Sequence, residues 1–485
     1  MELSLAGLIV IVMLLLIGWA AGATILIALM CAIPFGATAW GSLPALGGSS
    51  PQIYTVFALL LVGRVVSNPQ AILHLRVAFG SHWIMPLIAG ITAYTLAGSI
   101  VYPRVFIGQT SAFVPIKGAI FEVPLSPVAG NITQSAYFAL GALCCIALAA
   151  DLHRRRNYEA VIKACYAWCA TNALLGIIDF CGKLVGLTDI LAPIRTASYS
   201  YLTASMEHNF WRIAGGFSEA SAFAGNTIAC VAFAFAYWRE TGARIAIVLC
   251  AANLALLVLS TSTTAYVALA LVCLPVLASL LVNVSRANIA RRELHILLLG
   301  LGVVALSIAV VVMVPKVAQP FIDMLDYVVL RKGESSSAQE RGYWNQKSIE
   351  SAIDTFGLGV GLGSSRASSW IIAVISQLGV AGALGFIAII YAVLRAPIHA
   401  RAVGIKATTK PAGLIRGARA AAFATIVSGS ISGAAADPGM TAFLFFAIAI
   451  TTAPALVSRN RQKHTNAGTT KSPNLVTMIP HAHQA

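Results

Sequence analysis

Glycines and arginines in one polar insertion of this chain have the types and spacing to bind an anion. The insertion covers residues 315–369, and every second residue of one run in it is glycine; the run consists of Gly357, Gly359, Gly361 and Gly363, followed by Ser364, Ser365 and Arg366. Glycine lets backbone N–H groups approach a ligand closely, and a helix N-terminus attracts negative charge. We therefore predict that Gly359, Gly361, Gly363 and Ser364 contact a phosphate-bearing lipid substrate at a membrane surface. Arg366 is expected to add positive charge.

The glycine run differs from the known nucleotide-binding loops. It has neither the Gly-Lys-Ser/Thr ending of a Walker A loop nor the strand–helix context of a dinucleotide site. Ser364 or Ser365 is expected to cap the spanning helix that follows, with Arg366 in its first turn. An arginine there opposes the helix dipole unless an anion or a carboxylate joins it. The alternative is an ordinary glycine-rich turn that joins a surface helix to a spanning one.

A second candidate site precedes the apolar stretch that begins at residue 220. We expect Ser218 to be the N-cap of a spanning helix and Glu219 to occupy its first turn, where the dipole favours a carboxylate. One interpretation is a structural clasp between Arg212 and Glu219 that orders the loop. The other is that Arg212 binds phosphate while Glu219 handles a proton or a sugar hydroxyl. His208 is either a further base that contacts substrate or a solvated loop residue.

Two short helices are predicted to position the arginines of the insertion. Residues 320–330 have the pattern of an amphipathic surface helix. A second helix, over 337–354, starts with a Ser-x-x-Glu capping box. Arg341 and Asn345 share one of its faces, and Trp344 is expected to dock at the membrane interface and contact the substrate. The alternative is a lid helix whose charges are merely solvated.

The composition identifies the elements that must carry these loops. Hydrophobic residues make up 58% of the 485, charged residues 10%, and the mean hydropathy is +0.83. We therefore predict an all-α, polytopic membrane protein with 12–14 transmembrane helices over residues 1–458 and a disordered cytoplasmic tail over 459–485. About thirteen apolar runs are candidates: 3–19, 21–40, 53–66, 83–101, 135–150, 159–187, 220–237, 243–259, 264–284, 295–314, 370–394, 418–431 and 440–457.

Basic residues predict the orientation. Arginines and lysines gather in alternate loops and in the tail, which places these loops and the C-terminus in the cytoplasm. The opposite parity places four segments outside: 104–131, 188–218, 315–369 and 434–439. The net charge of +15 is then a topology signal that also attracts the anionic inner leaflet, so nucleic acid is not an expected partner.

Several reactive residues are expected to be structural. The nine cysteines lie in or beside the spans, so no disulfide framework is predicted. Cys165 and Cys169, one turn apart, are expected to be apolar fillers, with a metal pair as the alternative. Asp179 and Lys183 have the spacing of a buried ion pair, for which we favour a structural role. Asp437, in an Ala-Ala-Asp-Pro-Gly segment, is predicted to be a turn residue.

Three segments resemble the bacterial O-antigen ligase/polymerase superfamily, which includes the Wzy-type polysaccharide polymerases. Residues 212–224, RIAGGFSEASAFA, resemble the family's Arg–Gly–Phe segment that leads into a helix. Residues 259–266, LSTSTTAY, resemble its serine-rich start of a span, and residues 341–385 resemble its large outer loop with the glycine run. The chain departs from the ligases, because Arg366 lies where they carry a histidine and Thr263 follows Ser262 where many members have an arginine.

The resemblance implies a membrane glycosyltransferase, and its departures favour a polymerase. Such an enzyme joins undecaprenyl-diphosphate-linked oligosaccharide repeats into an O-antigen, capsule or exopolysaccharide at the outer face of the bacterial inner membrane. Arg212, Arg341 and Arg366 are then candidates to stabilise the lipid diphosphate leaving group, and Glu219 to accept the attacking hydroxyl's proton. No cofactor or metal is expected. Expected partners are the lipid-linked oligosaccharide, membrane lipids and a chain-length regulator or export complex.

Two alternatives remain open at this point. One is an O-antigen ligase that transfers glycan to lipid A-core. The other is a transporter of lipid-linked oligosaccharide or polysaccharide, which would also bind diphosphate with arginines. A transporter is expected to place its charges along spanning helices, whereas the candidate charges of this chain concentrate in outer loops. This distribution favours chemistry at the membrane surface.

Overall fold

The computed structural model is mostly helical (74%). It describes residues 2–22, 24–44, 49–116, 119–155, 157–198, 202–207, 210–286, 292–298, 300–302, 319, 336–395 and 410–451. The predicted surface helix over 320–330, His208, the tail and most of the run 295–314 lie outside these residues.

Six helices in the described ranges are long and apolar enough to cross a membrane: α5 (Ile84–Val105), α6 (Ala129–Arg155), α7 (Tyr158–Leu184), α8 (Ala220–Thr241), α10 (Thr263–Ser285) and α14 (Trp370–Arg395). A seventh candidate is a bent pair, α3 (Tyr54–Val66) with α4 (Ala71–Ser81), which turns by 103°. The prediction of an all-α, multi-pass membrane protein is therefore confirmed. The number of about thirteen spans stays a prediction.

Other helices fill most of the remaining predicted runs: α1 (Leu5–Ala20), α2 (Thr24–Ala32), α9 (Arg244–Leu259), α16 (Lys410–Ser432) and a helix over Gly439–Thr451. Helix α2 ends well before residue 40, the predicted limit. Pro34 explains this, because proline offers no N–H to a helix and restricts the residue before it. Helix α4 was not predicted.

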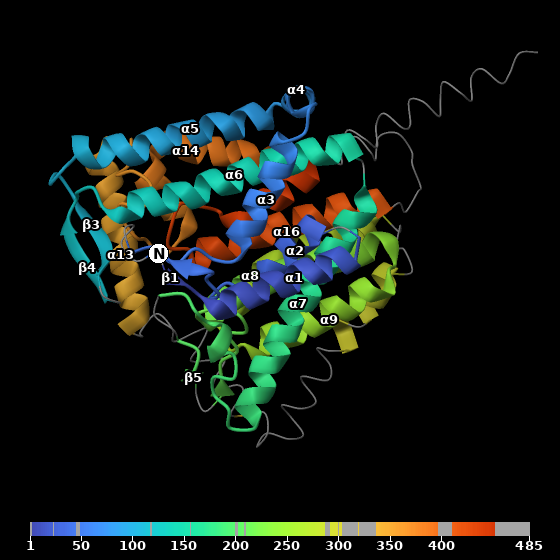
Figure 1. Cartoon of the computed structure of the whole chain (residues 1–485). Helices are drawn as coiled ribbons and strands as arrows, with labels where there is room; N and C mark the ends of the chain where they lie inside the picture. The colour runs from blue at the N-terminus through green and yellow to red at the C-terminus, as the bar shows by residue number, and fades with distance from the viewer. Residues whose placement is uncertain are drawn as a thin grey trace, which may run out of the picture.

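Figure 1 shows the long helices side by side, with most of the small elements gathered at one end of them. This end carries hairpin β3–β4 (Ser111–Ile116 and Ala119–Pro124), hairpin β5–β6 (Met206–Glu207 and Phe210–Trp211) and helix α13 (Ser336–Asp354). Strands β1 (Glu2–Leu3) and β2 (Gly41–Ser42) also pair. We call this the loop end; the sequence predicted helix α13 to within a residue at its start but none of the hairpins.

Buried amides join three helices inside the core. Asn172 of α7 donates to Thr227 of α8 at 2.9 Å and to Asn253 of α9 at 2.8 Å, while Asn226 of α8 donates back to Asn172 at 2.8 Å. Such bonds satisfy polar groups that hydrocarbon cannot. Cys165 belongs to the same buried core, as predicted for an apolar filler.

Candidate functional site

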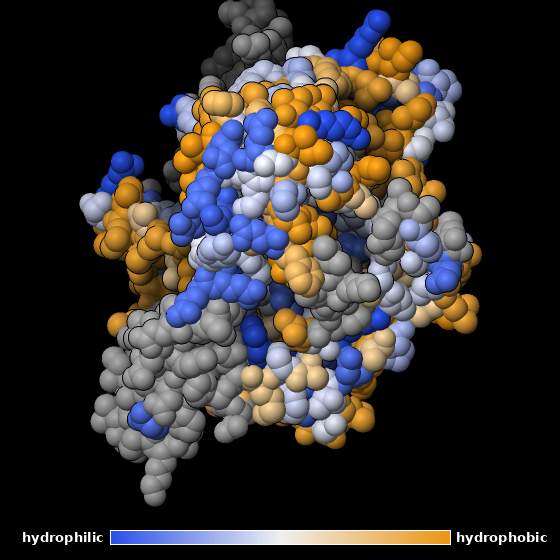
Figure 2. Space-filling view, turned by 90° about the vertical axis from the view of Figure 1, so that its left-hand side faces the viewer, coloured by the Kyte–Doolittle hydropathy of each residue, from blue (hydrophilic) through white to orange (hydrophobic). Residues whose placement is uncertain are grey.

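A recess of about 580 Å³ lies at the loop end. Phe113, Ser198, Arg366 and Asp437 all line it, so each of the four segments predicted to share one side contributes a wall. Tyr54 of α3 and Tyr137 of α6 line it as well. Figure 2, which looks at this side of the molecule, shows hydrophilic residues over the surface and hydrophobic residues along its margins.

Two smaller recesses continue the first. One, of about 300 Å³, shares Gln134 and Asp437 with it, and the other, of about 420 Å³, shares Tyr54 with it. The two smaller recesses have Pro438 in common. The third reaches Ser218, next to Glu219 in the chain. Asp437 therefore lies where the first recess meets the second.

Arg366 is the cationic residue of the main recess. Its side chain is accessible to solvent, and its guanidinium lies over the ring of Trp344, 5.9 Å from the centroid. The recess walls partly desolvate it, so burial lowers the pKa of Arg366; the nearby Glu219 carboxylate raises that pKa, and Arg341 lowers it. Arginine stays charged despite such shifts. Two of the other predicted catalytic residues, Glu219 and Arg341, thus lie near enough to Arg366 to act on its charge.

The segment with Arg366 is held by hairpin β3–β4 and by α13. The backbone N–H of Phe113 donates to Ser365 Oγ at 3.0 Å, and the ring of Phe113 lies 6.2 Å from that of Trp344. Asn345 Oδ1 accepts a hydrogen bond from the N–H of Ser368 at 2.8 Å. The predicted face of α13 therefore contacts the Arg366 loop. Trp344 packs against Phe113 and Arg366, and its place at the membrane interface stays a prediction.

Tyr343 fixes α13 to the hairpin from its other side. Its hydroxyl donates to Glu122 Oε2 at 2.7 Å, and its ring lies 5.9 Å from that of Phe113. This bond lowers the pKa of Glu122 and raises the pKa of Tyr343. Arg341, on the same helix, is thereby held near the recess instead of moving freely in a loop.

The glycine run has a different role from the one predicted. Gly359 and Gly361 are buried, and their N–H groups donate to Thr355 Oγ1 at 3.2 Å and to the carbonyl of Gln377 at 3.0 Å. Gly363 donates to Gln377 Oε1 at 3.3 Å. Helix α14 is interrupted at Gly379 (φ 68°, ψ −169°), and the run packs into this break. The N–H groups of these three glycines therefore donate to acceptors within the protein. Of the three, Gly363 alone also lines the main recess.

Glycine is required in the run because of close backbone approach. The four alternate glycines all have positive φ, between 74° and 89°. A Cβ at Gly363 would lie 2.2 Å from the carbonyl oxygen of Gly130, and one at Gly359 would lie 2.7 Å from the nitrogen of Gly379. The alternation predicted from the sequence is thus a packing requirement.

The two serines after the run do not cap α14, so that prediction was wrong. The helix begins at Trp370, and the carbonyl of Ser369 accepts its first hydrogen bond, from Ala373 at 2.8 Å. Ser364 is buried and bonds Asn131 and the carbonyl of Val360. Arg366 precedes the helix by four residues and is not in its first turn. It is therefore free of the unfavourable dipole position that was expected.

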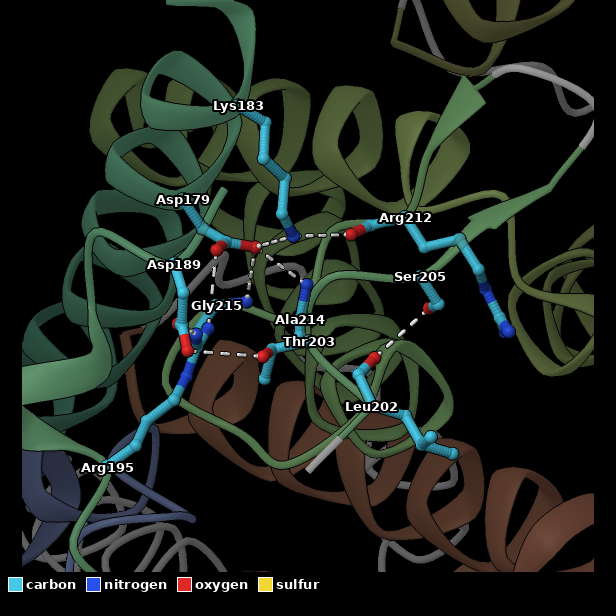
Figure 3. A network of polar contacts seen from close by, with 10 residues as sticks. All are labelled: Asp179, Lys183, Asp189, Arg195, Leu202, Thr203, Ser205, Arg212, Ala214 and Gly215. Atoms are coloured by element: carbon cyan, nitrogen blue, oxygen red, sulfur yellow. Dashed lines mark hydrogen bonds and ion pairs between the residues drawn. The ribbon is translucent and has the colours of Figure 1, made fainter. Parts of the chain in front are cut away.

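The segment with Arg212 is held by a buried ionic network, drawn in Figure 3. Asp179 Oδ2 accepts from Lys183 Nζ at 2.8 Å and from the N–H groups of Ala214 and Gly215 at 2.8 and 3.1 Å. Lys183 Nζ also donates to the carbonyl of Arg212 at 2.6 Å. The predicted Asp179–Lys183 ion pair is confirmed, with both side chains fully buried.

Two further residues complete the network. Arg195 donates to Asp179 Oδ1 at 3.3 Å, to the carbonyl of Gly215 at 2.5 Å and to Asp189.

The side chain of Arg212 points away from these groups (Figure 3). Arg212 is not among the described residues that line the three recesses. The network thus uses the backbone of Arg212, and its side chain is placed apart from Arg366's recess.

Glu219 is itself the N-cap position of α8, in place of the predicted Ser218. Its backbone is extended (φ −155°, ψ 161°), and helix α8 starts at the next residue. The hydroxyl of Ser221 donates to Glu219 Oε1 at 2.5 Å. A carboxylate in this position interacts favourably with the dipole of the helix. The clasp between Glu219 and Arg212 stays a prediction.

Asp437 is a site residue that the sequence interpretation treated only as a turn. The turn is confirmed, since Asp437 Oδ1 accepts from the N–H of Gly439 at 2.9 Å. The same carboxylate lines two recesses, and burial raises the pKa of Asp437 to about 6. The available signal was the place of this acidic residue, in a predicted outer turn between two apolar runs.

No family model matches the chain, and no curated protein matches its sequence. The fold and the site define only a class: a multi-pass membrane protein with a polar, arginine-bearing recess at one end of its helices. The resemblance to the O-antigen ligase/polymerase superfamily stays a prediction from sequence.

Proposed function

We propose that this protein is a polysaccharide polymerase of the bacterial inner membrane. It joins undecaprenyl-diphosphate-linked oligosaccharide repeats at the outer face, with about thirteen spans and a cytoplasmic C-terminus. The observation that carries the proposal is the main recess: Arg366 lines it, with Arg341 and Glu219 close enough to act on its charge. The four segments that meet there are those that the basic residues assign to the outer side.

The walls of the recess suit a glycan. Hydroxyl and amide groups supply donors and acceptors for sugar hydroxyls, and the two tyrosines offer flat faces for sugar rings. The hydroxyl, amide and tyrosine side chains of the walls are Ser49, Ser50, Gln52, Tyr54, Thr133, Gln134, Tyr137 and Ser198. A carbohydrate makes many hydrogen bonds and has few charges, so a wall that is polar but mostly uncharged fits it.

Arg366 suits the leaving group. When the glycosidic bond between sugar C1 and the lipid diphosphate breaks, negative charge grows on the diphosphate oxygen. A guanidinium binds such oxygens with two parallel N–H groups, and the partly desolvated setting of Arg366 strengthens the interaction. Arg341 adds a second cation from α13, while Glu219 balances part of the charge when the site is empty.

Polymer length tests the proposal in cells. A strain that lacks the gene is complemented with wild type, Arg366→Ala, Arg341→Ala or Lys347→Ala, and its surface or exported polysaccharide is sized on a gel. Lys347 is the matched control, because it lies on α13 but pairs with Glu350 at 2.7 Å. We expect long chains from wild type and Lys347→Ala, and single repeat units from Arg366→Ala.

Three results would count against the polymerase. Full-length polymer from Arg366→Ala, present in the membrane at the wild-type level, would show that this arginine is not needed for chain growth. Lipid-linked repeats that accumulate on the inner side of the membrane in the deletion strain would identify a transporter instead. Intact long chains that are no longer attached to lipid A-core would identify a ligase.

A further inference from the structure

We propose that Asp437 accepts the proton of the attacking sugar hydroxyl, and that the two smaller recesses, which continue the main recess, hold the acceptor glycan. This inference rests on the proposed polymerase function and names the group and the channel that function needs. It replaces Glu219, which the sequence favoured for the proton, by a residue that lines the recess itself.

Asp437 is the only carboxylate among the described residues that line the three recesses. Glu219 differs in two ways. Its carboxylate already has a protein partner, because it accepts the hydroxyl of Ser221 at 2.5 Å at the N-terminus of α8. Its residue is not among those that line the recesses. Glu219 therefore acts on the charge of Arg366, and Asp437 faces the space where a substrate can bind.

The backbone ties Asp437 to Arg366. The N–H of Ala367 donates to the carbonyl of Ala434 at 3.1 Å, and Trp370 Nε1–H donates to the carbonyl of Ala436 at 3.0 Å. The loop that carries the guanidinium and the turn that carries the carboxylate are thereby held as one unit across the recess. A leaving-group cation and a proton acceptor need such a fixed relation, because a displacement depends on the positions of both groups.

The electrostatic setting suits a base. The ionisable groups in the described recess walls, besides Asp437, are Arg366 from the loop before α14, Tyr54 from α3 and Tyr137 from α6. Burial raises the pKa of Asp437 to about 6, which makes its carboxylate more basic than an exposed one while it remains mostly ionised at neutral pH. The N–H of Gly439, which donates to Asp437 Oδ1, limits this rise because it favours the ionised carboxylate.

The connected recesses give the acceptor a path. From the main recess the second continues past Gln134, Trp370 and Thr425, and the third continues along α8 and α16 to Ser218. Hydroxyls, amides and the Trp370 indole alternate on this path with apolar residues such as Phe217 and Met440. Sugar units can use both, because hydroxyls and amides bond sugar hydroxyls while apolar and aromatic surfaces contact the sugar rings. Because Asp437 lies at the junction, the hydroxyl at the end of an acceptor chain in the second recess faces a donor in the first.

The proposed step balances. The acceptor oxygen forms a bond to C1 of the donor sugar, and its proton passes to Asp437 Oδ. The C1–O bond to the diphosphate breaks, and the electron pair leaves with the lipid diphosphate beside Arg366. The proton on Asp437 returns to solvent through the recess before the next cycle. No oxidant, reductant or further reactant takes part.

Asp437→Asn tests the assignment. Asparagine keeps an oxygen for the N–H of Gly439, so the turn is preserved while the base is lost. Purified protein is incubated with lipid-linked repeats extracted from the deletion strain, and the rate of chain growth is followed between about pH 5 and 9. We expect wild-type activity to fall below about pH 6, and Asp437→Asn to lose about 100-fold or more in rate together with this acid limb.

Controls separate this inference from the proposed function. Asp354→Asn removes an exposed carboxylate at the end of α13 and should keep both rate and pH profile. Asp437→Glu should recover part of the rate, and thermal melting confirms that each variant is folded. If folded Asp437→Asn keeps the wild-type rate and acid limb, the proton acceptor lies elsewhere while the polymerase stands. If wild type does not lengthen the chains at all, both proposals fail.

Discussion

Two ionic clusters at the loop end show how charge is used in this protein. Around Asp179, opposite charges and backbone groups satisfy one another, and the side chains of Asp179 and Lys183 are fully buried. Around Arg366, the cation and Asp437 face a recess of about 580 Å³. The first cluster holds the chain, whereas the second leaves charge available to a ligand. Burial with close pairing of opposite charges therefore distinguishes the structural ions of this molecule from those that can do chemistry.

The largest effect is expected at the buried cluster around Asp179, where a substitution should lower the stability of the protein. Lys183→Ala removes one of the two cationic side chains that pair with the buried carboxylate of Asp179, and it removes the donor to the carbonyl of Arg212. Breaking one side of a buried pair costs about 3–5 kcal/mol. We expect a clear drop in melting temperature in detergent, whereas Arg366→Ala should melt close to wild type. If Lys183→Ala and wild type had equal melting temperatures, the cluster around Asp179 would be no more important for stability than the cluster around Arg366.

The next effect concerns activity at the recess. Arg366→Ala should lower the rate of chain growth by about 10²–10³-fold, the usual loss when one group that stabilises transition-state charge is removed. Arg366→Lys keeps the charge but not the fork of N–H groups, so we expect an intermediate rate. The measurement is the initial rate with lipid-linked repeats. A larger loss in Arg366→Lys than in Arg366→Ala would contradict the leaving-group role.

A smaller effect links pH and stability. The pKa of Asp437 in the folded protein is about 6, above the ordinary value of 3.8, so the folded state favours the protonated form. The stability that this provides is present below pH 3.8 and is lost as pH rises through about 6. Asp437→Asn cannot ionise, so it should be more stable than wild type at about pH 8, by about 1–2 kcal/mol, and similar at about pH 4. Melting curves at the two values test this, and a variant less stable at the higher pH would contradict it.

The smallest effect concerns the support of Arg366. Trp344→Leu removes the ring under the guanidinium, 5.9 Å from its centroid, and a partner of Phe113. A partly exposed cation–π contact contributes about 0.5–1 kcal/mol, so chain growth should slow only a few-fold. Tyr391→Leu is the matched control, because it removes a ring under another guanidinium, that of Arg395, 5.0 Å from its centroid. A loss as large as that of Arg366→Ala would give Trp344 a role beyond support.

The sequence predicts the helices and their grouping well, because both depend on local patterns. Apolar runs place most helices near their observed limits, and the basic residues group the segments that meet at the recess. The Asp179–Lys183 pair was readable from its spacing alone. These features need only helical periodicity and the cost of charge in hydrocarbon.

Long-range contacts account for what was missed. The glycine run suggests a ligand until Gln377 and the break at Gly379 are placed beside it, and neither partner is visible from the run. Asp437 has the local pattern of a turn, and only the approach of Arg366 and Gln134 gives it a recess. Hairpin β3–β4 is an exception, because its pattern is local: two mostly apolar runs, SAFVPI and AIFEVP, lie on either side of Lys117-Gly118. It was missed as a hairpin, yet Phe113 in it fixes the Arg366 loop.

The most direct test of the proposed polymerase function is chain growth by the purified protein. Wild type, Arg366→Ala and Lys347→Ala are supplied with lipid-linked repeats, and the length of the lipid-linked product is measured by gel or mass spectrometry. We expect products of several repeats from wild type and Lys347→Ala, and unreacted single repeats from folded Arg366→Ala. Single repeats from wild type, or equal chain growth from Arg366→Ala, would contradict it.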